Sequence, residues 1–298
     1  MLLAVTEPTW WRAWIFDGPS IAFLVGIGTL YIQGELLRRR QTGLARPRRV
    51  AAFTVGWVVV LLSVVSPVAG LADQLLWVHM VQHLLFTVVA APLLALGAPQ
   101  ATIRRALPPR TRSRLASAVR RVGLRRRAWA PPPIMLAGAV HAASWWLWHA
   151  PVLYDLAATN AAVHLLEHIM FLGSAVWFWT AVVAATRRGR RHHALATLSL
   201  GGLIAQGGLL GALMTFAPRS VYAAYEGAWG LTALEDQQLA GTLMWVPPSF
   251  VYAIVAIALF VRWFEIVERD ARRRSQRRTP APTPGAEQAT SGTPTGES

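Results

Sequence analysis

Seven long apolar segments run through this chain, and they determine the class of fold that it can adopt. A hydrocarbon layer about 30 Å thick requires roughly 20 mostly apolar residues to cross it as a helix. Backbone groups cannot remain unpaired in lipid, so segments of this kind must be helical there. We therefore predict an all-α fold, a polytopic membrane helix bundle with seven transmembrane helices. Their approximate ranges are 15–35, 50–68, 77–98, 134–150, 160–185, 194–217 and 238–263.

The basic residues predict the orientation of this bundle. All 29 of them are arginine, and 27 lie in alternate loops or in the C-terminal part. Cytoplasmic loops of membrane proteins carry an excess of basic residues. The N-terminus is therefore predicted to lie outside and the C-terminus in the cytoplasm. The chain is predicted to be a multi-pass protein of a bacterial plasma membrane. The arginine-rich segments are 38–49, 100–133, 187–191 and 262–278.

This topology divides the chain into three parts. Residues 1–14 form an extracytoplasmic N-terminus, and residues 15–263 form the seven-helix transmembrane domain. The basic cytoplasmic loop of this domain, at about 100–133, is expected to contain a short surface helix. Residues 264–298 form a cytoplasmic tail that is first basic and then Pro/Thr/Gly-rich and disordered. The net charge of +15 is spread over loops that meet anionic headgroups, so membrane lipids and no nucleic acid are the expected partners.

Two histidine pairs stand inside the apolar segments. The stretches HMVQHLLF and HLLEHIMF begin at His79 and His164, and each has a second histidine four residues later, at His83 and His168. Residues four apart share one face of a helix, so each pair can point both imidazoles at one position. An ionisable side chain in lipid is costly unless it has a partner, which makes it a functional-site hypothesis. The predicted orientation places both pairs in the outer leaflet.

Further candidate ligands are predicted on the same outer side. His141 and His149 lie eight residues apart on the fourth segment, and Glu167 can orient or neutralise a neighbouring histidine. His192 and His193 follow arginines in a cytoplasmic loop and are predicted to be solvated. The predicted metal ligands are His79, His83, His164, His168, His141 and His149, with Glu167, Asp73, Asp236, Met214 and Met244 in support.

The absence of cysteine limits the chemistry of such a site. It excludes disulfides, thiolate metal sites, iron–sulfur clusters and cysteine nucleophiles. Imidazole suits copper, zinc or iron, and methionine shifts the preference towards copper(I). Bis-histidine haem b between the third and fifth helices and a proton relay also fit the residues. The stretch HLLEH matches the H-x-x-E-H pattern of inverzincin zinc hydrolases, although the sequence shows neither a further ligand nor a water-filled cleft.

Three long motifs of this chain are similar to those of a known family. They are WVHMVQHLLFTVVAAPLLALGAP (77–99), WHAPVLYDLAATNAAVHLLEHIMFL (148–172) and YAAYEGAWGLTALEDQQLAGTLMWVP (222–247). They resemble the CtaG-type family of cytochrome c oxidase assembly factors, which are seven-helix membrane proteins associated with caa3-type oxidases. The resemblance extends over roughly residues 15–263. The matching positions are His79, His83, His149, Pro151, Tyr154, His164, Glu167, His168, Glu235, Asp236, Gln237, Gln238, Met244 and Trp245.

This resemblance implies a non-enzymatic role in assembling an aa3- or caa3-type oxidase, with oxidase subunits as partners. Copper delivery through the outer-leaflet histidines is our interpretation, and other copper chaperones would then be partners too. The alternatives are a copper or proton transporter and a bis-histidine haem-binding membrane protein. Transport needs polar side chains through the whole bundle, and the inner halves of the segments have few beyond Gln206 and scattered serines and threonines. This distribution favours a site that is reached from one side.

Overall fold

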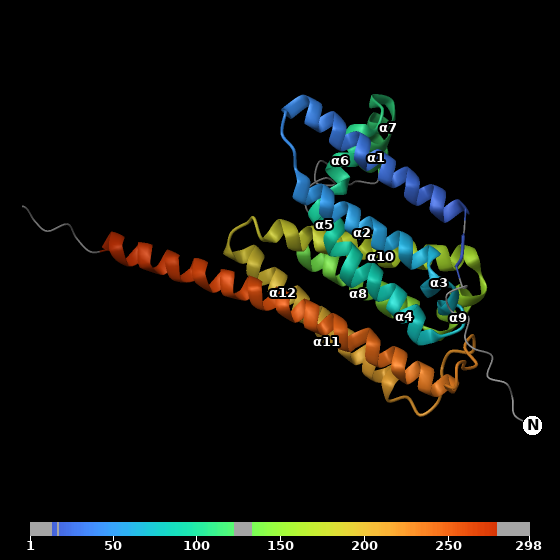
Figure 1. The fold of residues 1–298 in the computed structure, drawn as a ribbon. Helices are drawn as coiled ribbons and strands as arrows, with labels where there is room; N and C mark the ends of the chain where they lie inside the picture. Colours follow the sequence, from blue (N-terminus) through green and yellow to red (C-terminus); the bar gives the residue numbers. More distant parts are fainter. Residues whose placement is uncertain (1–13, 17, 122–132, 279–298) are drawn as a thin grey trace, which may run out of the picture.

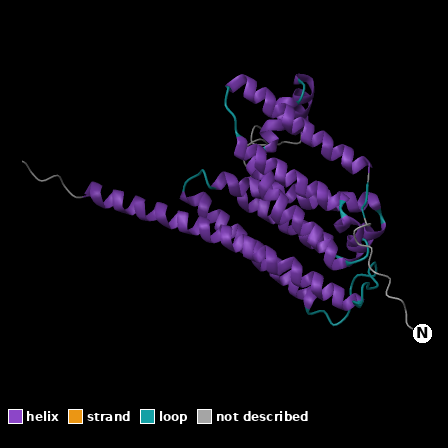
Figure 2. Ribbon diagram, in the orientation of Figure 1, coloured by secondary structure: helices purple, strands orange, loops and turns teal. Residues whose placement is uncertain are grey.

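The computed structural model describes residues 14–16, 18–121 and 133–278, and over these residues it contains helices and loops without any strand (Figure 2). Figure 1 shows the longer helices side by side in one bundle. The elements are α1 (Gly18–Thr42), α2 (Pro47–Val65), α3 (Pro67–Ala72), α4 (Leu76–Leu84), the π-helix η2 (Leu85–Ala90), α5 (Ala91–Gly97), α6 (Pro99–Ala106), α7 (Pro109–Arg121), α8 (Ile134–Trp148), α9 (Pro151–Thr159), α10 (Ala161–Ala185), α11 (Arg190–Thr215) and α12 (Ala233–Arg278).

The prediction of an all-α membrane bundle is confirmed. Within the described part of the chain, six helical stretches are long and apolar enough to cross a membrane. They overlap the first three and the last three predicted segments, with ends that differ by several residues. The fourth segment forms α8, which is apolar but has only 15 residues. A seventh crossing and the orientation of the termini stay predictions.

The third apolar segment is not one regular helix. The α4 helix continues into η2 and then into α5, so a π-helical turn begins just after His83. Pro92, near the start of α5, has no N–H, and its ring clashes with the carbonyl four residues earlier. Regular α-helical hydrogen bonding therefore cannot run through this point, and a π-helical turn accommodates the interruption. Such turns are frequent near functional sites.

The last helix is longer than predicted. The predicted segment ended at residue 263, whereas α12 continues through the basic part to Arg278. This part contains neither glycine nor proline, and two Glu–Arg pairs four residues apart support it. Their oxygen–nitrogen distances are 3.2 Å for Glu265–Arg269 and 2.6 Å for Glu268–Arg272. The predicted N-terminus, the end of the basic loop and the disordered tail lie largely outside the described residues, in 1–13, 122–132 and 279–298.

The two ends of the bundle differ in charge. The arginine-rich segments lie in the α1–α2 loop, the α10–α11 loop and the distal part of α12, towards the left of Figure 1, and in the short helices α6 and α7 at its top. The expected surface helix of the basic loop is found as α7, whose arginines Arg110, Arg112 and Arg114 are exposed. The short helices α3 and α9 and the loop before α12 lie at the opposite end.

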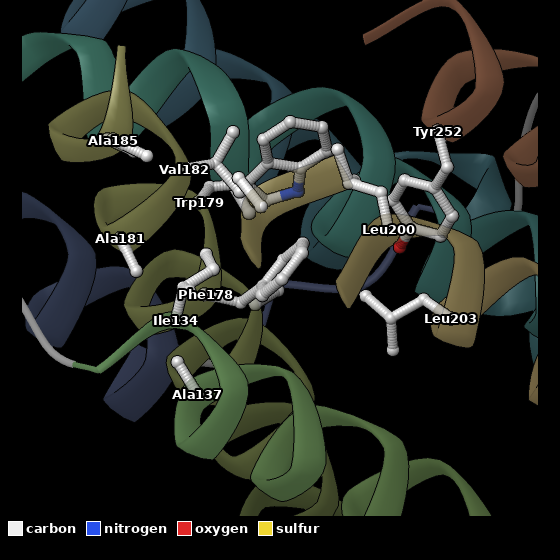
Figure 3. Packing of buried hydrophobic residues seen from close by; sticks show 14 of the residues in the cluster. Ile134, Ala137, Phe178, Trp179, Ala181, Val182, Ala185, Leu200, Leu203 and Tyr252 are labelled. Carbon is white, nitrogen blue, oxygen red and sulfur yellow. The ribbon is translucent and has the colours of Figure 1, made fainter. Parts of the chain in front are cut away.

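An apolar core fills the half of the bundle near the arginine-rich loops. Side chains of α8, α10, α11 and α12 meet there, among them Phe178, Trp179, Leu200 and Tyr252 (Figure 3). Helices in lipid gain little from the hydrophobic effect and associate through close van der Waals packing, so small residues at their crossings matter. This core separates the basic end from the polar half described below.

Gly34 marks the close approach of α1 to α6. A Cβ atom at Gly34 would lie 2.0 Å from the carbonyl oxygen of Thr102 on α6, whereas a Cβ atom at Gly26, on the same helix, would meet nothing within 4 Å. We expect Gly34→Ala to force the two helices apart, at a cost of about 1–3 kcal/mol, and to lower the melting temperature in detergent. Gly26→Ala is the matched control and should leave the melting temperature unchanged or raise it, because alanine favours helices. If the two variants had the same melting temperature, this close contact between α1 and α6 would be contradicted.

Candidate metal centre

The two histidine pairs face each other across the contact between α4 and α10. The ring centroids of His79 and His164 lie 5.3 Å apart, and those of His83 and His168 lie 5.5 Å apart. Within each helix the paired rings are 4.3 Å and 4.2 Å apart. His79 and His83 are almost fully buried. The expectation that each pair presents two imidazoles to one position therefore matches the geometry, and the two positions lie next to each other with His79 between them.

A buried glutamate completes this group. Glu167 is 0% exposed, and its two carboxylate oxygens lie 3.8 Å from His79 Nε2 and 3.9 Å from His83 Nε2. These distances exceed hydrogen-bonding range, and neither oxygen has a hydrogen-bond partner. A buried carboxylate without a partner costs several kcal/mol, about the penalty expected for an ion removed from water. The histidine cluster is defined here as His79, His83, His164, His168 and Glu167.

The histidine cluster contains two overlapping groups of three ligands. The outer set consists of His79, His164 and His168, and the inner set consists of His79, His83 and Glu167. In each set the three potential ligand atoms lie within 4.8 Å of one another. All members of the inner set are buried, whereas two members of the outer set are partly exposed. His79 belongs to both sets.

Several nitrogen atoms of the cluster lack partners. His83 Nδ1, His164 Nε2 and His168 Nε2 are buried and make no hydrogen bond. In native structures the large majority of buried side-chain polar atoms are hydrogen-bonded, and concentrated exceptions are typical of binding or catalytic sites. Imidazole nitrogens and a carboxylate that lie close together and lack partners are donor types that a metal ion binds.

A chain of hydrogen bonds begins at Asp236 and supports α4. The Asp236 carboxylate accepts hydrogen bonds from the backbone N–H groups of Leu76 at 2.8 Å and Trp77 at 2.9 Å. These are orphan donors at the start of α4, so a residue of α12 caps a helix that is 160 residues away in sequence. Because the Leu76 amide bonds to Asp236, the carbonyl of Ala72 four residues earlier needs another donor.

Tyr225 supplies that donor and thereby sets the tautomer of His79. Its hydroxyl donates to the Ala72 carbonyl at 2.9 Å and lies 2.9 Å from His79 Nδ1. Burial raises the pKa of Tyr225 well above its usual range, so the hydroxyl keeps its single proton for Ala72. His79 Nδ1–H must then donate to the tyrosine oxygen, and His79 Nε2 carries a lone pair. That nitrogen lies 2.9 Å from His83 Nε2, so in this state His83 donates to it.

The loop between α11 and α12 is fastened over this end of the bundle. The Asp155 carboxylate accepts hydrogen bonds from the N–H groups of Ala223 at 3.3 Å and Ala224 at 3.1 Å. The hydroxyl of Tyr222 donates to the carbonyl of His149 at 3.0 Å. These contacts hold Tyr225 against the cluster. Sequence reasoning did not assign Tyr225 to the site, although the family motif YAAYEGAW contains it.

Two of the predicted histidine ligands lie outside both ligand sets. His141 Nδ1 is 2.9 Å from the hydroxyl of Ser174, and its ring stacks on Phe178 at the edge of the apolar core. His149 ends α8, and its Nδ1 lies 2.7 Å from the carbonyl of Trp145. Neither joins the two ligand sets found among the described residues. The reason is the packing of α8, which directs His141 towards a part of α10 more than one turn beyond His168.

The predicted supporting residues are divided in the same way. Met214 and Met244 are buried in an apolar cluster with aromatic side chains, and Asp236 has the capping role described above. Met244 also borders a cavity of about 10 Å³ beside His83 and His149.

His193, predicted to be solvated, is only 4% exposed because it lies on the inner face of the first turn of α11. That prediction was wrong.

Replacing the Tyr225 hydroxyl tests its effect on His79. In Tyr225→Phe we expect His79 to lose its fixed Nδ1–H form, because the oxygen that accepts this proton is gone. Imidazole ¹⁵N spectra of the metal-free protein should report a mixture of tautomers, and affinity for a metal ion should fall about 10–100-fold. Tyr252→Phe is the matched control, because it removes a buried hydroxyl in the apolar core away from both ligand sets, and it should change neither readout. An unchanged His79 tautomer in Tyr225→Phe would contradict the assignment.

Comparison with known proteins identifies the family of this chain. The family model described as cytochrome c oxidase caa3 assembly factor (Caa3_CtaG) matches residues 29–265, which include the whole histidine cluster. No individual curated protein and no solved structure matches the chain. The family match spans most of the sequence and agrees with the resemblance of the three motifs. The chain belongs to the family of caa3-type cytochrome c oxidase assembly factors.

Proposed function

We propose that this chain helps to assemble an aa3- or caa3-type cytochrome c oxidase by holding copper as cargo in the histidine cluster. It acts without catalysing a reaction and passes the ion to an oxidase subunit or receives it from a copper chaperone by ligand exchange. One observation carries the proposal: two ligand sets share His79 and leave a buried carboxylate and three imidazole nitrogens without partners. Family membership supplies the assembly role.

The ligand chemistry supports copper as the cargo. The chain has no cysteine, so a soft metal must be bound by imidazole with help from thioether or carboxylate groups. The outer set offers three imidazoles, a donor set that suits copper. The inner set replaces one imidazole by the carboxylate of Glu167, which supplies the negative charge that a buried cation requires. Met244 lies close by, next to the small cavity beside His83.

The apolar core favours a holding role over transport. Phe178, Trp179 and Leu200 pack together in the apolar core (Figure 3). They belong to the half of the bundle nearer the arginine-rich end. An ion that crossed the bundle would need polar side chains along this path. The arginine distribution further supports an outer position for the cluster, with lipid headgroups around the basic end.

Copper retention tests this proposal. Detergent-purified protein is loaded with Cu(I), washed and analysed for metal and for its absorption spectrum. We expect the wild type to retain copper and His79→Ala/His83→Ala to lose it, because this double variant removes ligands of both sets. His164→Ala/His168→Ala removes two of the three ligands of the outer set and should lose the copper that this set holds. His141→Ala is the matched control: it removes a buried imidazole outside both sets and should retain copper. The proposal would be contradicted if the wild type retained no copper after loading and washing, or if it showed a haem Soret band.

Acidification should release the metal. Neutral imidazole binds copper and protonated imidazole does not, so protons compete with the ion for every histidine of the cluster. We expect the retained copper to fall as the pH is lowered from about 7.5 to 5, the range in which histidine titrates. Copper content after dialysis at a series of pH values measures this. Retention that does not depend on pH would argue against ligation by histidine.

A further inference from the structure

A groove beside the histidine cluster opens between the α2–α4 region and the start of α10. Its volume is about 520 Å³, and it lies at the end of the bundle opposite to the arginine-rich loops. Backbone hydrogen bonding of Ile15 to Val65 at 3.2 Å holds the chain that forms one side of it. The residues that line this outer groove are Ile15, Val64, Ala69, Asp73, Gln82, Ala161, Ala162, His164, Leu165 and His168.

The outer groove and the histidine cluster share a wall. His164 and His168 line the groove and are also two of the three members of the outer set. Both are partly exposed, whereas His79, the third member, is only 2% exposed. A ligand in the groove therefore meets the outer set first, and the inner set lies behind it.

Gln82 presents an unpartnered oxygen at this groove. Its side-chain N–H₂ donates to the carbonyl of Ser63 at 2.7 Å. This contact identifies which atom of the side-chain amide is nitrogen, so the other atom is the oxygen Oε1. Gln82 is 2% exposed, and Oε1 has no hydrogen-bond partner. A buried acceptor without a partner costs about 1–3 kcal/mol, and a cation or a donor in the groove would remove that cost.

Asp73 adds a negative charge at the same place. Its carboxylate is exposed and lines the groove, and it interacts electrostatically with His164. A carboxylate attracts cations from solution, and amide and carboxylate oxygens can replace water around an ion before imidazole nitrogens bind it. From the mouth of the groove inwards, the polar groups are thus the exposed carboxylate of Asp73, the buried Oε1 of Gln82 with the partly exposed His164 and His168, and then the buried His79.

We infer that the outer groove is the port through which a metal cation reaches the histidine cluster. Asp73 draws the cation to the groove, Gln82 Oε1 replaces part of its hydration, and His164 and His168 bind it as part of the outer set. His79, which belongs to both sets, then passes the ion to His83 and Glu167. Each step exchanges one ligand for another and involves neither oxidation nor reduction. This inference rests on the proposed function and adds the route by which the cation enters the cluster.

Loading kinetics test the port. Ag(I), a redox-stable monovalent ion, is mixed with detergent-purified protein in chloride-free buffer, and tryptophan fluorescence follows its uptake. Asp73→Asn should load several-fold more slowly and with a weaker dependence on ionic strength, because one steering charge is lost. Ala162→Phe, which places a bulky ring at the exposed wall of the groove, should also slow loading. Both variants should reach the silver content of the wild type.

Glu226→Gln is the matched control. It removes an exposed carboxylate that does not line the groove, and loading should proceed at the wild-type rate. Wild-type rates in both Asp73→Asn and Ala162→Phe would overturn the port while the proposed function stands. A lower final silver content in Asp73→Asn would make Asp73 a ligand of the site itself and would also overturn its role in the port. A wild type that takes up neither silver nor copper would overturn the proposed function and the port together.

Discussion

A polar group inside a lipid-embedded bundle has to find its partner within the protein, and this constraint shapes the outer half of the molecule. Glu167 and four imidazoles are gathered between α4 and α10, where His79 and His83 bond to each other. The Glu167 carboxylate and one ring nitrogen each of His83, His164 and His168 have no hydrogen-bond partner there. The apolar half next to the arginine-rich loops has no comparable group among the residues of its core. The cost of burying the cluster is therefore concentrated where a bound cation would remove it.

The register between α4 and α10 gives the cluster its two-part form. His79 and His164 lie in the first turns of their helices, and His83, Glu167 and His168 lie about one turn further in. Because the two helices run in the same direction at this end, ligands at two depths become available, with His79 within reach of both. A carboxylate in the deeper set and imidazoles in the outer set offer an ion two different environments a few ångströms apart.

Support for this arrangement comes from the last helix and the loop before it. Asp236 caps α4, the carbonyl of Ala72 accepts a hydrogen bond from the Tyr225 hydroxyl, and the same hydroxyl accepts a hydrogen bond from His79. The final link joins residues 146 positions apart in the sequence. The tautomer of His79 thus depends on a carboxylate that touches none of the histidines of the cluster.

The sequence by itself determined the helices, their apolar character and the two histidine pairs, because each of these follows from the spacing of residues along one helix. It also placed the pairs at the end away from the arginines, since helices alternate in direction. Only the tertiary structure decided that His141 turns to Ser174, that Tyr225 contacts His79, and that Asp73 and Gln82 line a groove beside the cluster. Such contacts depend on which helices are neighbours and how they are rotated, and helical periodicity contains neither fact.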